Sequence, residues 1–207
     1  HTLKKVTPQG RVSVYSAGTA DRQMITPNYA AFDTHGNLYV TDSGNWKGDD
    51  GCIWRVAPGG ETIVIDTECA QFPNGCAVSP DGQYLYVAMS LNPPRVVRFR
   101  IENGQRAGGV EVVSQLPRTV PDGLAFCADG ILLVSCYRPD TIYCLLPDGA
   151  ITVLMDDYEG TLLGGPTNVC FAGPNLSVLL WANLGRWHLG MNVHTGLKGV
   201  AVFYPKL

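Results

Sequence analysis

Charged residues are scarce in this chain of 207 residues, at 16% of the total, and neither sign dominates. The formal net charge is −3 and the pI about 5.7, so the basic surface that nucleic acids and anionic membranes attract is lacking. Apolar runs such as Ile131–Val134 are far shorter than the ~20 residues of a membrane span. The first residues lack the pattern of a signal peptide. We therefore expect no nucleic-acid and no membrane partner.

Cysteine pairs at zinc-ligand or redox spacing are also absent. The seven cysteines are an odd number and form no Cys-x-x-Cys pair. They are Cys52, Cys69, Cys76, Cys127, Cys136, Cys144 and Cys170, and most of them fall in apolar, strand-like runs. We expect reduced core cysteines in a cytoplasmic protein, with a Cys69–Cys76 disulfide as the alternative.

Several catalytic signatures are missing from the sequence. It contains no Gly-x-Ser-x-Gly elbow, no Walker A pattern and no His-Glu-x-x-His motif. Serine hydrolase and nucleotide-binding functions therefore lack support.

What the chain has in quantity is glycine (24) and proline (14), and these residues mark an internal repeat. Residues 73–82 begin Pro-Asn-Gly and end Pro-Asp-Gly, and residues 121–130 begin Pro-Asp-Gly and end Ala-Asp-Gly. Residues 27–36 match these runs, and 166–171 start a weaker fourth copy. The four leading prolines are 46, 48 and 45 residues apart. A period of about 40–50 residues, made of short strands and Asp-Gly turns, predicts an all-β fold, the β-propeller.

Each repeat is expected to form a four-stranded antiparallel blade, and residues 1–207 a single propeller domain. The predicted units are a partial blade at 1–15 and blade repeats at 27–66, 73–114, 121–154 and 166–204. In the fourth repeat the strands are predicted at 168–172, 177–182 and 199–204, with a long loop at 183–198. Asp-Gly turns should place glycine at positive φ.

The connections of such blades sort onto two faces. The short turns fall on one face, and the variable loops fall on the other together with the start of each blade's first strand. First strands are innermost, so four side chains should surround the axis on the variable face: Asn28, Asn74, Asp122 and Thr167. Function is expected on this face.

The ring of Asn28, Asn74 and Asp122 offers amide and carboxylate oxygens, which Ca²⁺ and Mg²⁺ prefer. The alternative is that asparagine and aspartate after proline only cap turns. Thr167 interrupts the series, which favours specialised positions over a general turn-capping role.

These runs resemble the gluconolactonase, senescence-marker (regucalcin) and luciferin-regenerating enzyme superfamily over nearly the whole chain. The resemblance rests on Phe72–Gly82, on Pro121–Phe126, and on Pro27 and Asn28 followed by Asp33, Gly36, Asn37 and Leu38. The single motifs also resemble those of strictosidine synthases and paraoxonases. Their order and spacing together make the resemblance specific.

The resemblance implies a six-bladed propeller with one divalent metal at the axial mouth that hydrolyses sugar lactones or other cyclic esters. It implies Asn74 and Asp122 as metal ligands, Asp122 also as the catalytic general base, and Asn28 as a substrate-pocket residue. Ca²⁺ is the first expectation for the metal, with Mg²⁺, Mn²⁺, Zn²⁺ and Fe²⁺ as alternatives. The partner would be a small-molecule lactone or cyclic ester.

Two departures from the family pattern stand out. The family's glutamate ligand lies in a first-blade motif that this sequence lacks. Six repeats of about 47 residues would need roughly 280 residues, and this chain covers about 4.4 of them. We therefore expect either a longer parent protein or a ring with fewer blades, and a homodimer if the ring is open. Thr26 also stands where animal members have a substrate-binding arginine, which argues against a sugar-acid lactone.

Loop residues on the variable face complete the candidate site. Trp46, Arg138, Asn183 and His188 are predicted to contact substrate, although an isolated loop histidine is often only solvated. The alternative functions are a non-catalytic propeller that binds a small ligand or a protein at an incomplete metal site, a strictosidine-synthase-like enzyme, and a sugar dehydrogenase propeller.

Overall fold

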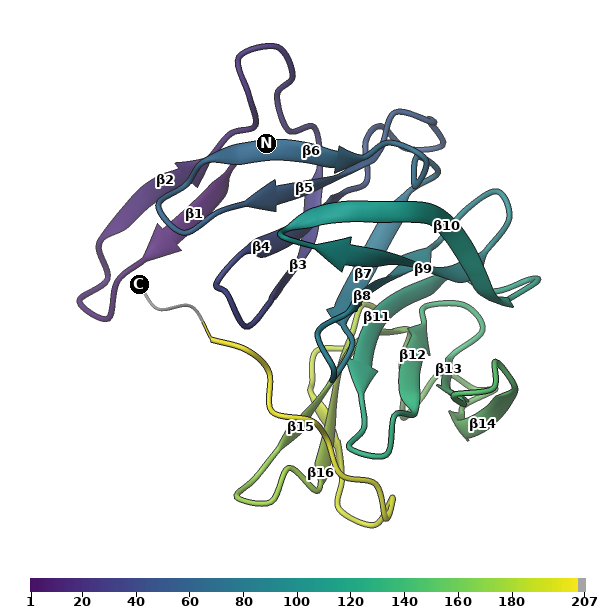
Figure 1. The fold of residues 1–207 in the computed structure, drawn as a ribbon. Coiled ribbons are helices and arrows are strands. Elements are labelled where there is room, and N and C mark those ends of the chain that lie inside the picture. Colours follow the sequence, from purple (N-terminus) through teal and green to yellow (C-terminus); the bar gives the residue numbers. More distant parts are fainter. Residues whose placement is uncertain (205–207) are drawn as a thin grey trace.

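A computed structural model describes residues 1–204, and within this range it consists of strands and loops without a helix (Figure 1). The strands are β1 (Leu3–Val6), β2 (Val12–Ser16), β3 (Pro27–Phe32), β4 (Leu38–Asp42), β5 (Cys52–Val56), β6 (Thr62–Asp66), β7 (Pro73–Val78), β8 (Tyr84–Met89), β9 (Arg95–Glu102), β10 (Gln105–Gln115), β11 (Pro121–Phe126), β12 (Leu132–Cys136), β13 (Thr141–Leu145), β14 (Ile151–Asp156), β15 (Pro166–Ala172), β16 (Val178–Asn183) and β17 (Gly190–Asn192). No helix in this range could cross a membrane.

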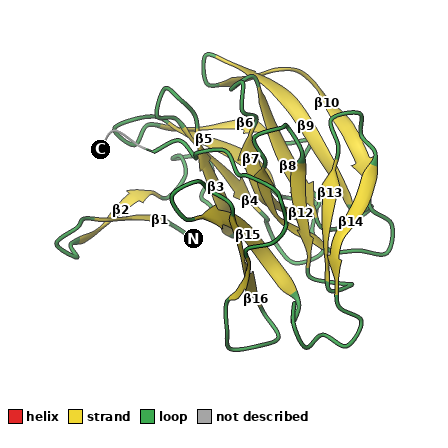
Figure 2. Ribbon diagram, turned by 90° about the horizontal axis from the view of Figure 1, so that it is seen from below, coloured by secondary structure: helices red, strands yellow, loops and turns green. Residues whose placement is uncertain are grey.

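Within each sheet, every strand pairs antiparallel with its neighbour in sequence, so the sheets are simple meanders. Three are four-stranded (β3–β6, β7–β10 and β11–β14), and they are flanked by the β1–β2 hairpin and the three-stranded β15–β17 sheet. The sheets fan around a common centre, and the first strands β3, β7, β11 and β15 lie next to one another there (Figures 1 and 2). The prediction of a β-propeller with four-stranded blades is confirmed.

The hydrophobic core lies between blades rather than inside one sheet. Tyr39 and Ile53 of the β3–β6 sheet pack against Leu85, Val87 and Phe99 of the β7–β10 sheet, and all five are fully buried. Similar clusters fill the next two interfaces and the contact of the β1–β2 hairpin with the β3–β6 sheet. Full burial stabilises by about 1.5–3 kcal/mol per large side chain, so each blade depends on its neighbours.

The Asp-Gly turns behave as predicted. Gly130 between β11 and β12 and Gly149 between β13 and β14 both have φ of +87°. The preceding Asp148 accepts a hydrogen bond from the Ala150 amide at 2.9 Å, and Asp129 one from the Ile131 amide at 3.3 Å. These local interactions close the hairpins on the face away from the predicted site.

The third strand of the fourth repeat was predicted at 199–204, and this prediction is wrong. The strand is β17, which pairs with Leu179–Trp181 of β16 from inside the predicted 183–198 loop. Gly190 makes this pairing feasible, because any Cβ there would overlap the Trp181 ring. Residues 199–204 are apolar but form only an isolated bridge, Gly199 with Cys127, beside the end of β11.

All seven cysteines are free, so the alternative Cys69–Cys76 disulfide is not formed. Six of them are buried and Cys170 is exposed. Burial raises the pKa of the Cys76 thiol to about 12, which keeps it protonated as a small apolar core group.

Candidate metal and substrate site at the axial mouth

The polar ring predicted from the repeats begins with Asn28, Asn74 and Asp122, each the second residue of an innermost strand (β3, β7 and β11). The glycine after each of the last two explains how closely these strands approach. A Cβ at Gly75 would overlap the Asp122 carbonyl oxygen, and a Cβ at Gly123 would lie 2.8 Å from the Thr167 carbonyl oxygen. Glycine is required because neighbouring backbones meet at this position, and their close approach brings together the strand starts that carry Asn74 and Asp122.

A hydrogen-bonded relay holds two of the three side chains. Asn74 Nδ2 donates to Ser90 Oγ at 3.2 Å, and Ser90 Oγ donates to the Pro121 carbonyl of the next blade at 2.6 Å. One blade earlier, Asn28 Nδ2 donates to Ser43 Oγ at 2.9 Å and Ser43 Oγ donates to the Pro73 carbonyl at 2.7 Å. We call this the Asn–Ser–Pro relay. It engages the amide nitrogen of each asparagine and leaves Oδ1 for another partner.

For Asn74 that other partner is absent from the described residues. The residue is 6% exposed, and its Oδ1 atom is buried without a hydrogen-bond donor in residues 1–204. An unsatisfied buried acceptor costs about 1–3 kcal/mol, and natural proteins keep one where water or an ion completes it. This atom is suited to a cation.

The relay stops at Asp122. Its strand pairs Pro121 with Cys136, so the position held by Ser43 and Ser90 is taken by Tyr137. Within residues 1–204 the Asp122 carboxylate has neither a hydrogen-bond donor nor a basic partner. Burial raises the pKa of Asp122 to about 7, the range in which a general base both accepts and releases a proton.

Together these two groups fit part of a hard-cation site. An unpaired carboxylate and an unpaired amide oxygen are the ligand types that Ca²⁺ and Mg²⁺ take, but Ca²⁺ needs six to eight oxygens. Among residues 1–204 no three His, Cys, Asp or Glu side chains converge as a ligand cluster. The residues present can hold a cation from one side only, and further oxygens must come from water, substrate or other protein groups.

A contact across the axis escaped sequence analysis. The Tyr29 hydroxyl donates to Asn168 Oδ1 at 3.2 Å, which joins β3 to β15. Both residues occupy the repeat position that is glycine at 75 and 123. Burial, with smaller contributions from nearby groups that include Asp122, raises the pKa of Tyr29, so its hydroxyl stays protonated. The sequence repeats contain a signal for this contact, because the side chain at this position varies from glycine to tyrosine.

The two serines of the relay also left a sequence signal. Ser43 and Ser90 each end a Leu-Tyr-Val-x-x-Ser run, at 38–43 and 85–90. Their role depends on strand register, which places them opposite the start of the first strand.

Two of the predicted loop residues contact neighbouring side chains. Trp46 is 64% exposed and stands edge-on to Phe72, with ring centroids 5.0 Å apart. Arg138 pairs with Asp140 at 2.6 Å and lies over the Tyr137 ring at 4.6 Å. Arg138 is therefore neutralised locally, and substrate contact by either residue stays a prediction.

Asn183 and His188 serve loop structure. Asn183 donates to the His188 carbonyl at 2.9 Å and accepts from the Arg186 amide at 2.8 Å. The His188 ring lies 3.3 Å from the Leu162 carbonyl oxygen. The first two bonds lie within the loop after β16, and the contact of His188 with Leu162 joins this loop to the loop before β15. Substrate binding by Asn183 and His188 also stays a prediction.

Beyond the polar ring the axis widens into an apolar cavity of about 590 Å³. Tyr29 begins its lining in the first full blade. In the other blades the lining begins two residues after the polar-ring position, at Cys76, Leu124 and Val169. Residues 200–204 line it as well.

Known proteins resemble this chain along most of its length. A gluconolactonase of Zymomonas mobilis subsp. mobilis is 25% identical over 222 residues, which cover 86% of this chain and 60% of that protein. A calcium-binding regucalcin from Agrobacterium tumefaciens shares the fold with a TM-score of 0.77 at 20% identity, over 96% of this chain and 70% of that one. A gluconolactonase from Xanthomonas campestris follows, with a TM-score of 0.74 at 19% identity, over 92% and 65%.

The chain thus spans 60% of the length of the curated relative that it matches. The two solved structures support the propeller fold. The family assignment rests on a family model, the SMP-30/gluconolactonase/LRE-like region, which matches residues 2–182. This chain belongs to the SMP-30/gluconolactonase/LRE-like family.

Proposed function

We propose that this chain forms the axial site of a hydrolase that opens a lactone or a related cyclic ester with the help of a divalent cation. One observation carries the proposal: an unsatisfied buried amide oxygen, Asn74 Oδ1, and an unpaired carboxylate, Asp122, lie at the mouth on adjacent inner strands. Family membership and the gluconolactonase relative support the reaction class.

Asp122 would act as the base and then as the acid. Its carboxylate takes a proton from the water that attacks the ester carbonyl, and it later gives this proton to the departing ring oxygen. The product is a hydroxy acid on one open chain, and its carboxyl group then releases a proton to solvent to become a carboxylate. A pKa of about 7 suits both steps near neutral pH.

Asn74 and Asp122 would hold the cation, with Ca²⁺ as the first candidate and Mg²⁺, Mn²⁺, Zn²⁺ or Fe²⁺ as alternatives. When bound, such a cation supplies Lewis-acid polarisation of an ester carbonyl. Asn28 is exposed at the mouth with its Nδ2 bound to Ser43, and its amide oxygen would accept a hydrogen bond from a substrate hydroxyl.

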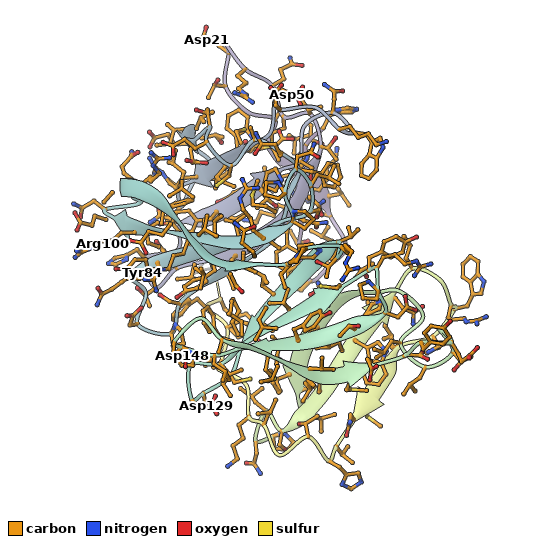
Figure 3. All side chains as sticks on the ribbon, turned by 90° about the vertical axis from the view of Figure 1, so that its right-hand side faces the viewer. Asp21, Asp50, Tyr84, Arg100, Asp129 and Asp148 are labelled. Carbon is orange, nitrogen blue, oxygen red and sulfur yellow. The ribbon has the colours of Figure 1, made fainter. Side chains whose placement is uncertain are left out.

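The direct test measures lactone hydrolysis by the 207-residue chain and by its Asp122→Asn variant. Proton release monitors the reaction in the presence of each cation. Loss of the base should lower the rate at least about 100-fold. Asp129→Asn is the matched control: Asp129 follows the same strand but lies in the turn away from the mouth, at the outer edge of the molecule (Figure 3).

Calorimetric titration of the same proteins with Ca²⁺ gives a readout that does not require turnover. Weaker binding by Asp122→Asn and unchanged binding by Asp129→Asn would support the site. Hydrolysis that survives either Asp122→Asn or excess chelator would contradict the mechanism. Cation binding without hydrolysis would favour a non-catalytic binding propeller.

A further inference from the structure

Tyr29 is the large side chain in a row that is otherwise small. The equivalent positions in the next two blades are Gly75 and Gly123, and the fourth holds Asn168. Its hydroxyl donates to Asn168 Oδ1 at 3.2 Å, so the ring crosses the axis between β3 and β15. A ring in this place limits how far any ligand at the mouth can extend inward.

Tyr29 is held both at its backbone and at its hydroxyl group. At its base, the Tyr29 amide donates to Thr41 Oγ1 at 3.0 Å, and Thr41 Oγ1 donates to the Asn74 carbonyl at 2.6 Å. The ring also packs against the buried cluster that contains Cys76. Because backbone, ring and hydroxyl all have partners, the side chain is fixed across the axis.

On the inner side of Tyr29 lies the axial cavity of about 590 Å³. Its walls are mostly apolar and include Ala31, Val78, Phe126, Phe171 and Val202. A cavity of this size accommodates a small ligand or the alkyl chain of one. The polar ring at the mouth and the apolar cavity therefore meet at Tyr29.

We propose that Tyr29 is a specificity-determining residue: its ring separates the Asn74–Asp122 mouth from the apolar cavity and so restricts the substrate to lactones without a long apolar substituent. This inference rests on the proposed lactone hydrolysis. It names the residue that limits the length of the apolar substituent that a substrate can carry.

The test compares two substrates, an unsubstituted five-membered lactone and the same ring carrying an eight-carbon alkyl chain. Tyr29→Ala joins mouth and cavity, so the ratio of kcat/KM for the alkyl lactone over the plain lactone should rise at least about tenfold, since each buried methylene contributes about fourfold. Tyr29→Leu keeps apolar packing with a shorter side chain and should raise the ratio less, which covers the case of an unstable alanine variant.

Two controls separate the ring from other effects. Tyr29→Phe keeps the barrier and loses only the bond to Asn168, so its ratio should shift less than that of Tyr29→Ala. Tyr143→Ala removes another partly buried tyrosine, on β13, that does not line the axial cavity, and it should leave the ratio unchanged. An unchanged ratio in active Tyr29→Ala and Tyr29→Leu would overturn the inference and leave the proposed function standing.

If the parent chain hydrolyses neither lactone, the proposed function fails by itself, and binding decides the role of Tyr29. Calorimetric titration with 2-octyltetrahydrofuran, a ring of similar shape that cannot be hydrolysed, should show tighter binding to Tyr29→Ala than to the parent. Equal affinities would overturn the role of Tyr29 as a barrier.

Discussion

Two aspartates near the same face of the propeller have opposite surroundings. Asp42, at the end of β4, is 1% exposed and accepts hydrogen bonds from three backbone amides and from Trp54 Nε1 at 3.1 Å. The amides are those of Ile25 at 2.8 Å, Thr26 at 2.7 Å and Gly44 at 3.2 Å. Asp122, at the start of β11, has no such donor among residues 1–204. Burial alone therefore does not identify a functional carboxylate; burial without hydrogen-bond donors does.

The difference has an energetic meaning. Donors around Asp42 replace the water that the carboxylate lost on folding, so its charge stabilises the loop before β3. Asp122 loses water without replacement, which destabilises its charged form and leaves it open to a proton or a cation. A protein keeps such a group at a cost in stability where function needs it.

Replacement of Asp42 should have the largest effect on stability. Asp42→Ala leaves three backbone amides and the Trp54 indole without an acceptor in a buried region, so the free energy of unfolding should fall by about 3 kcal/mol or more. Urea unfolding monitored by tryptophan fluorescence measures this. A loss below about 1 kcal/mol would break the contrast with Asp122.

Breaking the relay should weaken cation binding next. Ser90→Ala removes the acceptor that orients the Asn74 amide, and loss of such an orienting group typically lowers metal affinity about 10–100-fold. Ser43→Ala makes the same change one blade earlier, beside Asn28, and should leave the affinity nearly unaltered. Equal losses in the two variants, measured by calorimetric titration, would show that the relay acts on the fold and not on the site.

The smallest effect should be a gain in stability on removing the Asp122 charge. Because the pKa is raised to about 7 in the folded protein, the folded state keeps a proton that the unfolded state loses near pH 4, and stability falls as pH rises through this window. At pH 8 the free energy of unfolding of metal-free Asp122→Asn should therefore exceed that of the parent by about 2 kcal/mol. The gain is no larger because partial exposure of Asp122 screens some of the cost of its charge.

This gain should vanish below about pH 4, where both states of the parent are protonated. Chemical unfolding of both proteins with chelator at pH 4, 6 and 8 gives the comparison. A parent that is more stable than Asp122→Asn at pH 8 would show that the carboxylate has a partner after all.

The sequence predicted features that depend on local or repeated signals. Strand alternation, glycine at 130 and 149, and the recurring Pro-Asn-Gly and Pro-Asp-Gly triplets each involve neighbouring residues, so the blades and the placement of Asn74 and Asp122 on inner strands followed from them. Propeller geometry then brings equivalent positions together at the axis without further information.

Contacts between distant residues could not be predicted in the same way. Tyr29 and Asn168 are 139 residues apart, and their bond depends on the size of the ring and the width of the axis. The wrong strand at 199–204 has a related cause, because the fit of Gly190 against Trp181 decides which segment pairs with β16. The unsatisfied state of Asn74 Oδ1 likewise becomes visible only once every neighbour is placed.

The row formed by Asn28, Asn74, Asp122 and Thr167 has a consequence for how this fold acquires chemistry. The four residues occupy one backbone position in four copies of a unit, yet they carry two amides, a carboxylate and a hydroxyl. Because the inter-blade clusters hold the strands independently of these side chains, a single substitution in the row exchanges one functional group for another while the scaffold persists. Each blade thus contributes one exchangeable functional group to the axial site.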